Sequence, residues 1–153
     1  MHAFISSRID YCNALFTGLP KNTTERLQLI QNSAAGLLTK TKRREHITPV
    51  LASLHWLPVM SRIDFKILLL TYKALNGTGP RYIANSLIHY VPTRTLRSST
   101  SGLLTAPRNT TKKIGDAAFA NYAPKLWNKI PKDIREASSL TIFKTKLNHI
   151  CLH

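Results

Sequence analysis

The sequence predicts a mainly α fold, a compact helical domain of about six or seven helices. Three observations favour this class. Apolar residues recur at intervals of three and four in several segments, which is the period of a helix with a buried face. Proline, glycine and capping residues separate these segments where helices begin and end. Of the 153 residues, 43% are hydrophobic, which is enough to form a single core.

Two helices are expected before residue 40. The first covers residues 3–16 and ends at the Gly18 and Pro20 punctuation. The second begins near Asn22, because Asn22 and Glu25 have the spacing of a capping box. Its apolar residues at helical intervals are Leu27, Ile30, Ala34, Leu37 and Leu38. The charged run "TKTKRREH" at 39–46 follows as a basic loop.

The longest helix is expected between Pro58 and Gly77, after a brief helix that starts at Thr48 and Pro49. The long helix is apolar on nearly all sides, so we expect it to pack against neighbours on two sides. Its three cations, Arg62, Lys66 and Lys73, fall on one narrow ridge at about 100° per residue. The prediction is a buried spine that is open along a basic edge.

The second half of the chain changes in texture. A short helix is expected after Pro80, and residues 91–114 form a basic, loop-rich interval with at most one short strand pair near 102–107. Two further helical segments cover 116–131 and 139–152, the last capped by Ser138 or Ser139. We therefore divide the chain into a helical core segment (1–90), a basic loop or linker (91–114) and C-terminal helices (115–153) that form one unit with the first segment.

The charge balance is strongly positive. The chain has 22 Lys and Arg residues against 7 Asp and Glu residues, a formal net charge of +15. Such a charge calls for an anionic partner: nucleic acid, an anionic membrane surface or an acidic protein. No apolar stretch reaches the roughly 18 residues that a membrane helix requires, which argues against a spanning role, and we expect no membrane partner.

The order of the charges favours nucleic acid. Between Asp64 and Asp116 there is no acidic residue, whereas cations recur throughout that interval and in the run at 39–46. These cations could neutralise several backbone phosphates, each releasing a counterion. The predicted nucleic-acid-binding residues are Lys40, Lys42, Arg43, Arg44, Arg62, Lys66, Lys73, Arg94, Arg97, Arg108, Lys112 and Lys113. The alternative is a basic surface with no ligand.

The sequence contains no pattern typical of an active site. The seven acids are scattered, and two-metal phosphoryl transfer needs carboxylates held together. There is no phosphate-binding glycine loop and no nucleophile elbow. We therefore expect no catalytic residue, cofactor, metal ion or small-molecule substrate. The two cysteines, Cys12 and Cys151, lack a paired spacing, which favours a reducing compartment inside the cell, the nucleus or the cytoplasm.

One aromatic pair has two interpretations. His55 beside Trp56 could stack on a base or donate a hydrogen bond to it, or the pair could connect two helices within the core, which we favour. The tyrosines among the cations raise the same question, because exposed rings bind single strands by stacking, although most rings at helical spacing belong to a core.

Three phrases of the sequence resemble a known family. They are "SSRIDYCNALFTGLP", the segment from "LQLIQNSAAGLLTK" through "HITPVLASLHWLPV" to "LLTYKALNG", and "AFANYAPKLWNKIPKDIREASSLTIFKTKL". In this order they resemble the C-terminal region of LINE-type, non-LTR retrotransposon polyproteins of the chicken-repeat and jockey group. The sequence differs from the family pattern at Gly36, where a long and often basic side chain is usual.

The resemblance implies a role beside a reverse transcriptase. In these polyproteins the polymerase precedes the matched region, and its Asp-Asp motif lies upstream, so no catalytic residue carries over. The implied role is to pack against the thumb end of the polymerase and to hold template RNA or primer duplex. The partners implied are the RNA or DNA backbone and the upstream polymerase domain. The chain could also come from a decayed element and have no cellular task.

Overall fold

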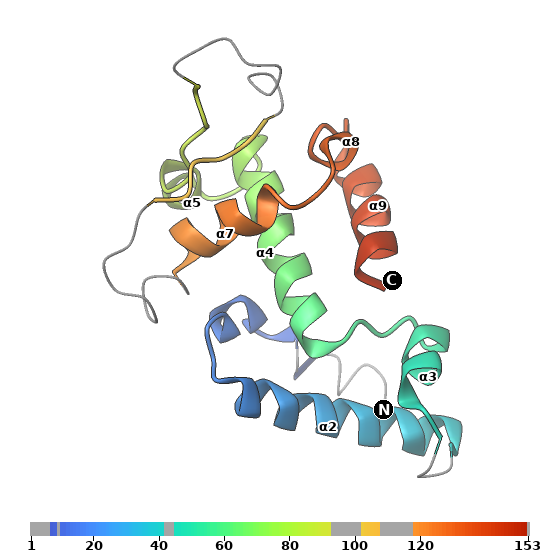
Figure 1. The fold of residues 1–153 in the computed structure, drawn as a ribbon. Coiled ribbons are helices and arrows are strands. Elements are labelled where there is room, and N and C mark those ends of the chain that lie inside the picture. The colour runs from blue at the N-terminus through green and yellow to red at the C-terminus, as the bar shows by residue number, and fades with distance from the viewer. Residues whose placement is uncertain (1–6, 9, 42–44, 93–101, 108–117, 153) are drawn as a thin grey trace.

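The fold is mainly helical, as predicted. A computed structural model describes residues 7–8, 10–41, 45–92, 102–107 and 118–152. Within them lie a 3-10 helix and seven α-helices (Figure 1): η1 (Asn13–Phe16), α2 (Lys21–Thr39), α3 (Ile47–Ser53), α4 (Val59–Leu75), α5 (Arg81–Asn85), α7 (Phe119–Trp127), α8 (Lys132–Arg135) and α9 (Leu140–Leu152). In these ranges no helix has both the length and the apolarity needed to cross a bilayer.

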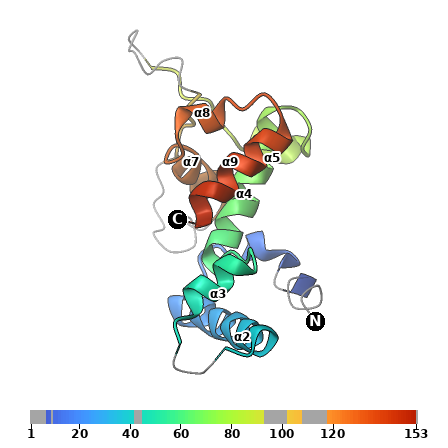
Figure 2. The same cartoon turned by 90° about the vertical axis from the view of Figure 1, so that its right-hand side faces the viewer.

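Helix α4 is the spine of the molecule. It contacts η1, α2, α5, α7 and α9, and two views at right angles show it running between the upper helices and the α2–α3 pair (Figures 1 and 2). The main hydrophobic core gathers Ile63, Ile67 and Tyr72 of α4 with Trp127 of α7 and Phe143 of α9. The prediction of a long helix packed on two sides is therefore confirmed.

Three stacked rings form the centre of this core. The rings of Tyr72 and Phe143 lie 4.3 Å apart, and those of Trp127 and Phe143 lie 6.0 Å apart. The Tyr72 hydroxyl donates a hydrogen bond to the Ala137 carbonyl over 2.7 Å. Aromatic packing with a satisfied hydroxyl fixes α9 against α4. The predicted N-cap at Ser139 is also present, since its Oγ accepts a hydrogen bond from Ile142 N at 3.3 Å.

The short strand expected near residues 102–107 is absent from that described segment. Only an isolated antiparallel bridge joins His89 and Leu104. The Asn128 side chain binds the backbone of Leu104 on both sides of the residue. Its Oδ1 accepts a hydrogen bond from Leu104 N at 2.9 Å, and its Nδ2 donates one to the Leu104 carbonyl at 2.8 Å. A side-chain amide thus satisfies backbone groups that a longer strand pair would have satisfied.

A smaller core joins α2 to α3. It contains Ala34, Ala35, Leu51 and Trp56. Two glutamines of α2 connect this unit to the start of α4. Gln28 Oε1 accepts a hydrogen bond from Val59 N at 2.8 Å, and Gln31 Nε2 donates to the Leu57 carbonyl at 2.9 Å. The Val59 N–H is one of the four donors that a helix start leaves without an intrahelical acceptor. Gln28 of α2 therefore supplies the acceptor that the first turn of α4 lacks.

The first two predicted helices differ in detail from the structure. Helix α2 begins at Lys21 with Pro20 as N-cap and without a side-chain cap, so the capping box at Asn22 was wrong. The Pro20 carbonyl already accepts from Thr23 N at 2.9 Å, which starts the helix earlier. The first predicted helix is interrupted where it is described, because Cys12 has a left-handed φ of 52° before η1.

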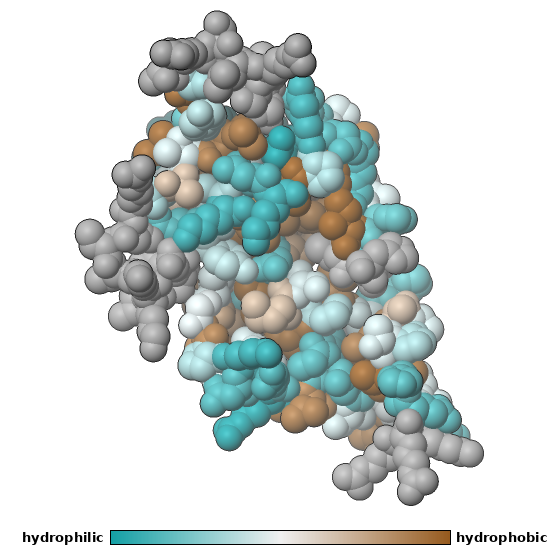
Figure 3. Space-filling model, viewed as in Figure 1, coloured by the Kyte–Doolittle hydropathy of each residue, from teal (hydrophilic) through white to brown (hydrophobic). Residues whose placement is uncertain are grey.

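The face of α2 that packs inward also differs from the apolar pattern. The buried residues of α2 include Gln31, Ala34 and Ala35, whereas Ile30 and Leu37 of the predicted apolar set are exposed. In Figure 3 hydrophobic side chains show at the surface among hydrophilic ones over the lower part of the molecule, where α2 lies. Small alanines allow α3 to approach closely, so the larger residues face outward.

Candidate nucleic-acid interface

Four of the twelve predicted cations lie in the described residues: Lys40, Arg62, Lys66 and Lys73. The other eight, namely Lys42, Arg43, Arg44, Arg94, Arg97, Arg108, Lys112 and Lys113, lie outside them.

Arg62 is held by protein groups. Its Nη1 lies 2.7 Å from Asp10 Oδ1, its Nε donates to the Leu57 carbonyl over 3.0 Å, and its side chain is only 12% exposed. These bonds join the N-terminal residues to the start of α4. Arg62 is thus a structural cation whose charge is already opposed by a carboxylate, and it offers little to a phosphate.

Lys66 has the opposite character. It lies one turn after Arg62 on the same ridge of α4 and is exposed. In the described part of the chain no carboxylate lies within ion-pair distance of it. A lysine ammonium in this setting is a compact charge with three donors, which suits a backbone phosphate.

Lys73 and Lys40 are distant from that position. Lys73 lies about 10 Å further along α4 at 1.5 Å per residue and lines a separate groove with Ser138 and Ser139. Lys40 is exposed at the C-terminal end of α2 with a left-handed φ of 54°. A cation there also complements the negative end of the helix dipole. Of the four predicted contact residues in the described chain, three therefore lie along α4, and Lys40 lies apart from them at the end of α2.

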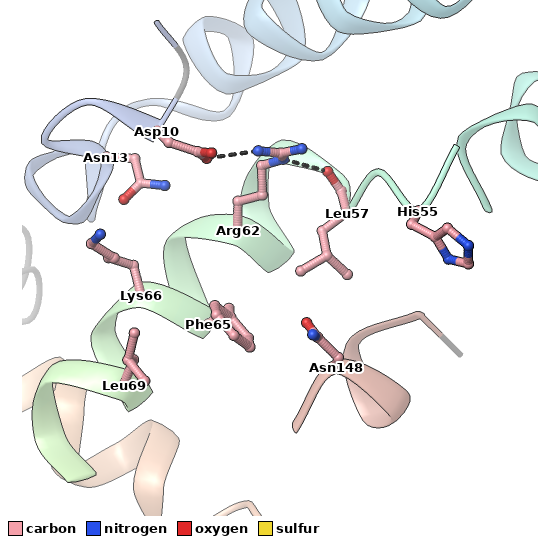
Figure 4. A pocket seen from close by; sticks show the side chains of 9 residues that line it. All are labelled: Asp10, Asn13, His55, Leu57, Arg62, Phe65, Lys66, Leu69 and Asn148. Atoms are coloured by element: carbon pink, nitrogen blue, oxygen red, sulfur yellow. Dashed lines mark hydrogen bonds and ion pairs between the residues drawn. The ribbon is translucent and has the colours of Figure 1, made fainter. Parts of the chain in front are cut away.

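A pocket of about 580 Å³ opens beside Arg62 and Lys66, between the N-terminal residues, α4 and α9 (Figure 4). We call it the α4 pocket. Helix α4 contributes Arg62, Phe65, Lys66 and Leu69, which share one face at intervals of three and four. The remaining lining residues are Asp10, Asn13, His55, Leu57 and Asn148.

Asn13 is the unusual residue of this pocket. It is buried, with 2% exposure, and its Oδ1 has no hydrogen-bond partner within the described residues. Figure 4 shows its side chain pointing from η1 toward α4 on the pocket wall. Buried polar atoms in native proteins nearly always have a partner, so the unpartnered acceptor of Asn13 is an exception within the described residues.

The two residues of the His55–Trp56 pair differ in burial. Trp56 is buried in the smaller core, as expected for a residue that connects two helices. His55 is exposed, has a left-handed φ of 53° and lines the α4 pocket. Among the tyrosines near the cations, Tyr72 is buried and Tyr82 and Tyr90 are exposed.

The sequence does not reveal that Asn13, Phe65 and Asn148 belong to one site. They are far apart in the chain, and neither an asparagine nor a phenylalanine carries a local signal of binding. Only the ridge spacing on α4 pointed to this location. Within the described residues no group of three histidine, cysteine, aspartate or glutamate side chains is placed to hold a metal ion.

Comparisons with known proteins leave the family open. No protein-family model, curated protein or solved structure matches the chain.

Proposed function

We propose that the chain is a non-catalytic nucleic-acid-binding region of a LINE-type reverse transcriptase polyprotein, which supports template RNA or primer duplex during target-primed reverse transcription. The charge balance carries the proposal. Even if each of the 7 carboxylates neutralised one of the 22 cations, a surplus of +15 would remain. A surplus of this size needs phosphates or another polyanion to offset its self-repulsion.

The distribution of ion pairs supports this interpretation. Three of the ion pairs in the described chain, Lys21–Glu25, Lys132–Glu136 and Lys146–Asp133, involve none of the predicted contact residues. Of the four predicted contacts that the structure describes, Arg62 alone has a carboxylate partner there. Lys40, Lys66 and Lys73 remain for phosphate. The resemblance to retrotransposon polyproteins implies the same class of ligand, and we propose a location in the nucleus or cytoplasm.

Binding is tested by fluorescence anisotropy with labelled RNA and DNA. We expect affinity at about 50 mM salt and a steep decline toward about 200 mM, because each neutralised phosphate releases a counterion. Reversing Arg43 and Arg44 to glutamate should weaken binding and flatten the salt dependence with the thermal midpoint intact. Lys132→Gln, in α8 at the other end of α4 from the pocket (Figure 1), is a control for the loss of one cation outside the predicted contact residues and should have little effect. Absence of salt-sensitive binding contradicts the proposal.

The exposed face of α2 favours a second candidate, an interaction module that packs on the polymerase. Leu29, Ile30 and Leu37 are 64%, 59% and 76% exposed, and neighbouring apolar side chains on one surface are typical of protein contacts. The same Arg43 and Arg44 reversal separates the candidates. Unchanged nucleic-acid binding together with lost association with the upstream polymerase segment supports the second.

A further inference from the structure

The α4 pocket brings together three kinds of group that match the three parts of a nucleotide. Lys66 supplies a cation for phosphate, Phe65 supplies a half-buried ring for the face of a base, and Asn13 supplies a buried amide for the edge of a base. Asn148 adds a second, exposed amide from α9. Figure 4 shows these side chains on the wall of the pocket, carried by η1, α4 and α9.

We infer that the α4 pocket accepts one unpaired base of a single-stranded nucleic acid, with the adjoining phosphate on Lys66. The inference rests on the proposed function and names the part of the ligand that enters the protein. A base stacked in a duplex has its Watson–Crick edge occupied, whereas a single strand can turn a base out for stacking and edge contacts.

The Asn13 amide distinguishes a base from a plain anion. Its Oδ1 is an acceptor without a donor in the described residues and is closed off from solvent, so a donor reaches it only when the pocket wall shifts, and an anion supplies no donor. Each of the four bases presents a donor next to an acceptor on its pairing edge, which matches the carbonyl and NH₂ of one amide.

The electrostatics of the wall agree with a nucleotide whose phosphate lies at Lys66. Asp10 would repel phosphate, but Arg62 opposes its charge at 2.7 Å. Lys66 therefore remains the exposed positive charge of the α4 ridge at the pocket. The pocket volume of about 580 Å³ lies within the range of small-molecule sites and leaves room for a base and its sugar.

The test uses the full chain and two probes: a DNA strand of about 8 nucleotides, within the usual site size of single-strand binders, and a strand of the same length and charge that lacks all bases. We expect the base-containing strand to bind about tenfold more tightly or better, since stacking of one base contributes that order. Equal affinity for the two strands overturns the inference but leaves the proposed function standing. Failure of both strands to bind contradicts the proposed function itself.

Variants identify the pocket. Asn13→Leu has nearly the same shape and no polar atom, so we expect the preference for bases to disappear while the thermal midpoint stays equal or rises. Phe65→Leu should reduce the preference as well. Lys66→Gln should weaken binding of both strands, and Lys132→Gln should weaken neither. If Asn13→Leu and Phe65→Leu retain the full preference for the base-containing strand, the base enters elsewhere and the inference is wrong.

Discussion

At the scale of single residues, a hydrogen bond between two partly buried polar side chains, Tyr122 and Asp64, affects the pKa of both. The Tyr122 hydroxyl donates a 2.7 Å hydrogen bond to Asp64 Oδ1. Burial raises the pKa of the Asp64 carboxyl above 3.8, while the hydrogen bond from Tyr122 and the charge of Lys129 act in the opposite direction. Burial, followed by the hydrogen bond to Asp64, raises the pKa of the Tyr122 hydroxyl. Tyr122 therefore stays protonated and remains a donor to Asp64.

The Asp64 shift predicts a pH dependence of stability. The folded state binds the Asp64 proton more tightly than the unfolded state, so the stabilising contribution of this proton is lost as pH rises from 3.8 through the raised pKa. Asp64→Asn removes this titration and keeps an acceptor for Tyr122. We expect the variant to gain stability relative to the parent between about pH 4 and about pH 7, measured by urea unfolding with circular dichroism.

A matched carboxylate serves as the control for this experiment. Asp133 is exposed and pairs with Lys146 at 3.5 Å, and surface pairs contribute little. Asp133→Asn should therefore change the pH profile much less than Asp64→Asn. A relative loss of stability for Asp64→Asn at the higher pH would show that ionised Asp64 is needed for the fold.

Asn13 is also a buried polar residue, but unlike Asp64 it has a side-chain oxygen without a hydrogen-bond donor in the described residues. An unsatisfied buried polar group costs about 1–3 kcal/mol of stability, and Asn13 Oδ1 is in that position within the described chain. An apolar residue of similar shape would avoid the cost. The presence of asparagine at this position is explained if a ligand, and not the fold, supplies its hydrogen bond.

At the scale of elements, α2 has an inner face that packing explains and an outer face with exposed apolar residues. Its inner face is made of small residues that pack on α3, and its glutamines complete the start of α4. Gly36 belongs to neither task, since a Cβ built there has no atom within 4 Å. A glycine inside a helix costs about 1 kcal/mol relative to alanine, so the isolated fold gains nothing from it.

The consequence for Gly36 can be measured directly. Gly36→Ala should raise the free energy of unfolding by about 1 kcal/mol, as determined by urea denaturation. Gly79→Ala is the contrasting control: its Cβ would lie 2.9 Å from the Ala74 backbone nitrogen, so we expect a loss of stability. If α2 docks on the polymerase, Gly36→Ala should weaken that association while it stabilises the chain. Destabilisation by Gly36→Ala would mean that the helix is strained at this position.

At the scale of the whole molecule, the net charge of +15 acts on stability and on binding in opposite ways. Like charges repel one another in the compact state, and salt screens this repulsion with a Debye length near 10 Å at about 0.1 M. Nucleic-acid affinity falls with the same salt. An increase in salt concentration is therefore expected to raise the stability of the chain while it lowers the affinity for nucleic acid.

We expect the thermal midpoint of the free chain to rise as sodium chloride is increased from about 50 mM to about 200 mM, measured by circular dichroism. The Arg43 and Arg44 reversal lowers the net charge by four and should reduce this rise. A midpoint that falls with salt would indicate that ion pairs stabilise the fold more than the surplus charge destabilises it.

The sequence by itself determined the helical class, the long α4 spine and the surplus of positive charge. These properties follow from local periodicity, from proline and glycine positions, and from counting. Pro58, for example, marks the start of α4: it is the N-cap residue, with an extended ψ of 153°, and Val59 is the first helical residue.

Only the tertiary structure decided which charges and faces are used. Arg62 and Lys66 look alike on the α4 ridge, yet Asp10, more than fifty residues earlier in the chain, occupies Arg62 and leaves Lys66 exposed. The buried face of α2 followed the small residues that fit α3 instead of the larger apolar ones. Asn13, Phe65 and Asn148 meet in one pocket because helices from distant segments pack on α4, and contacts between distant segments leave no periodic trace in a sequence.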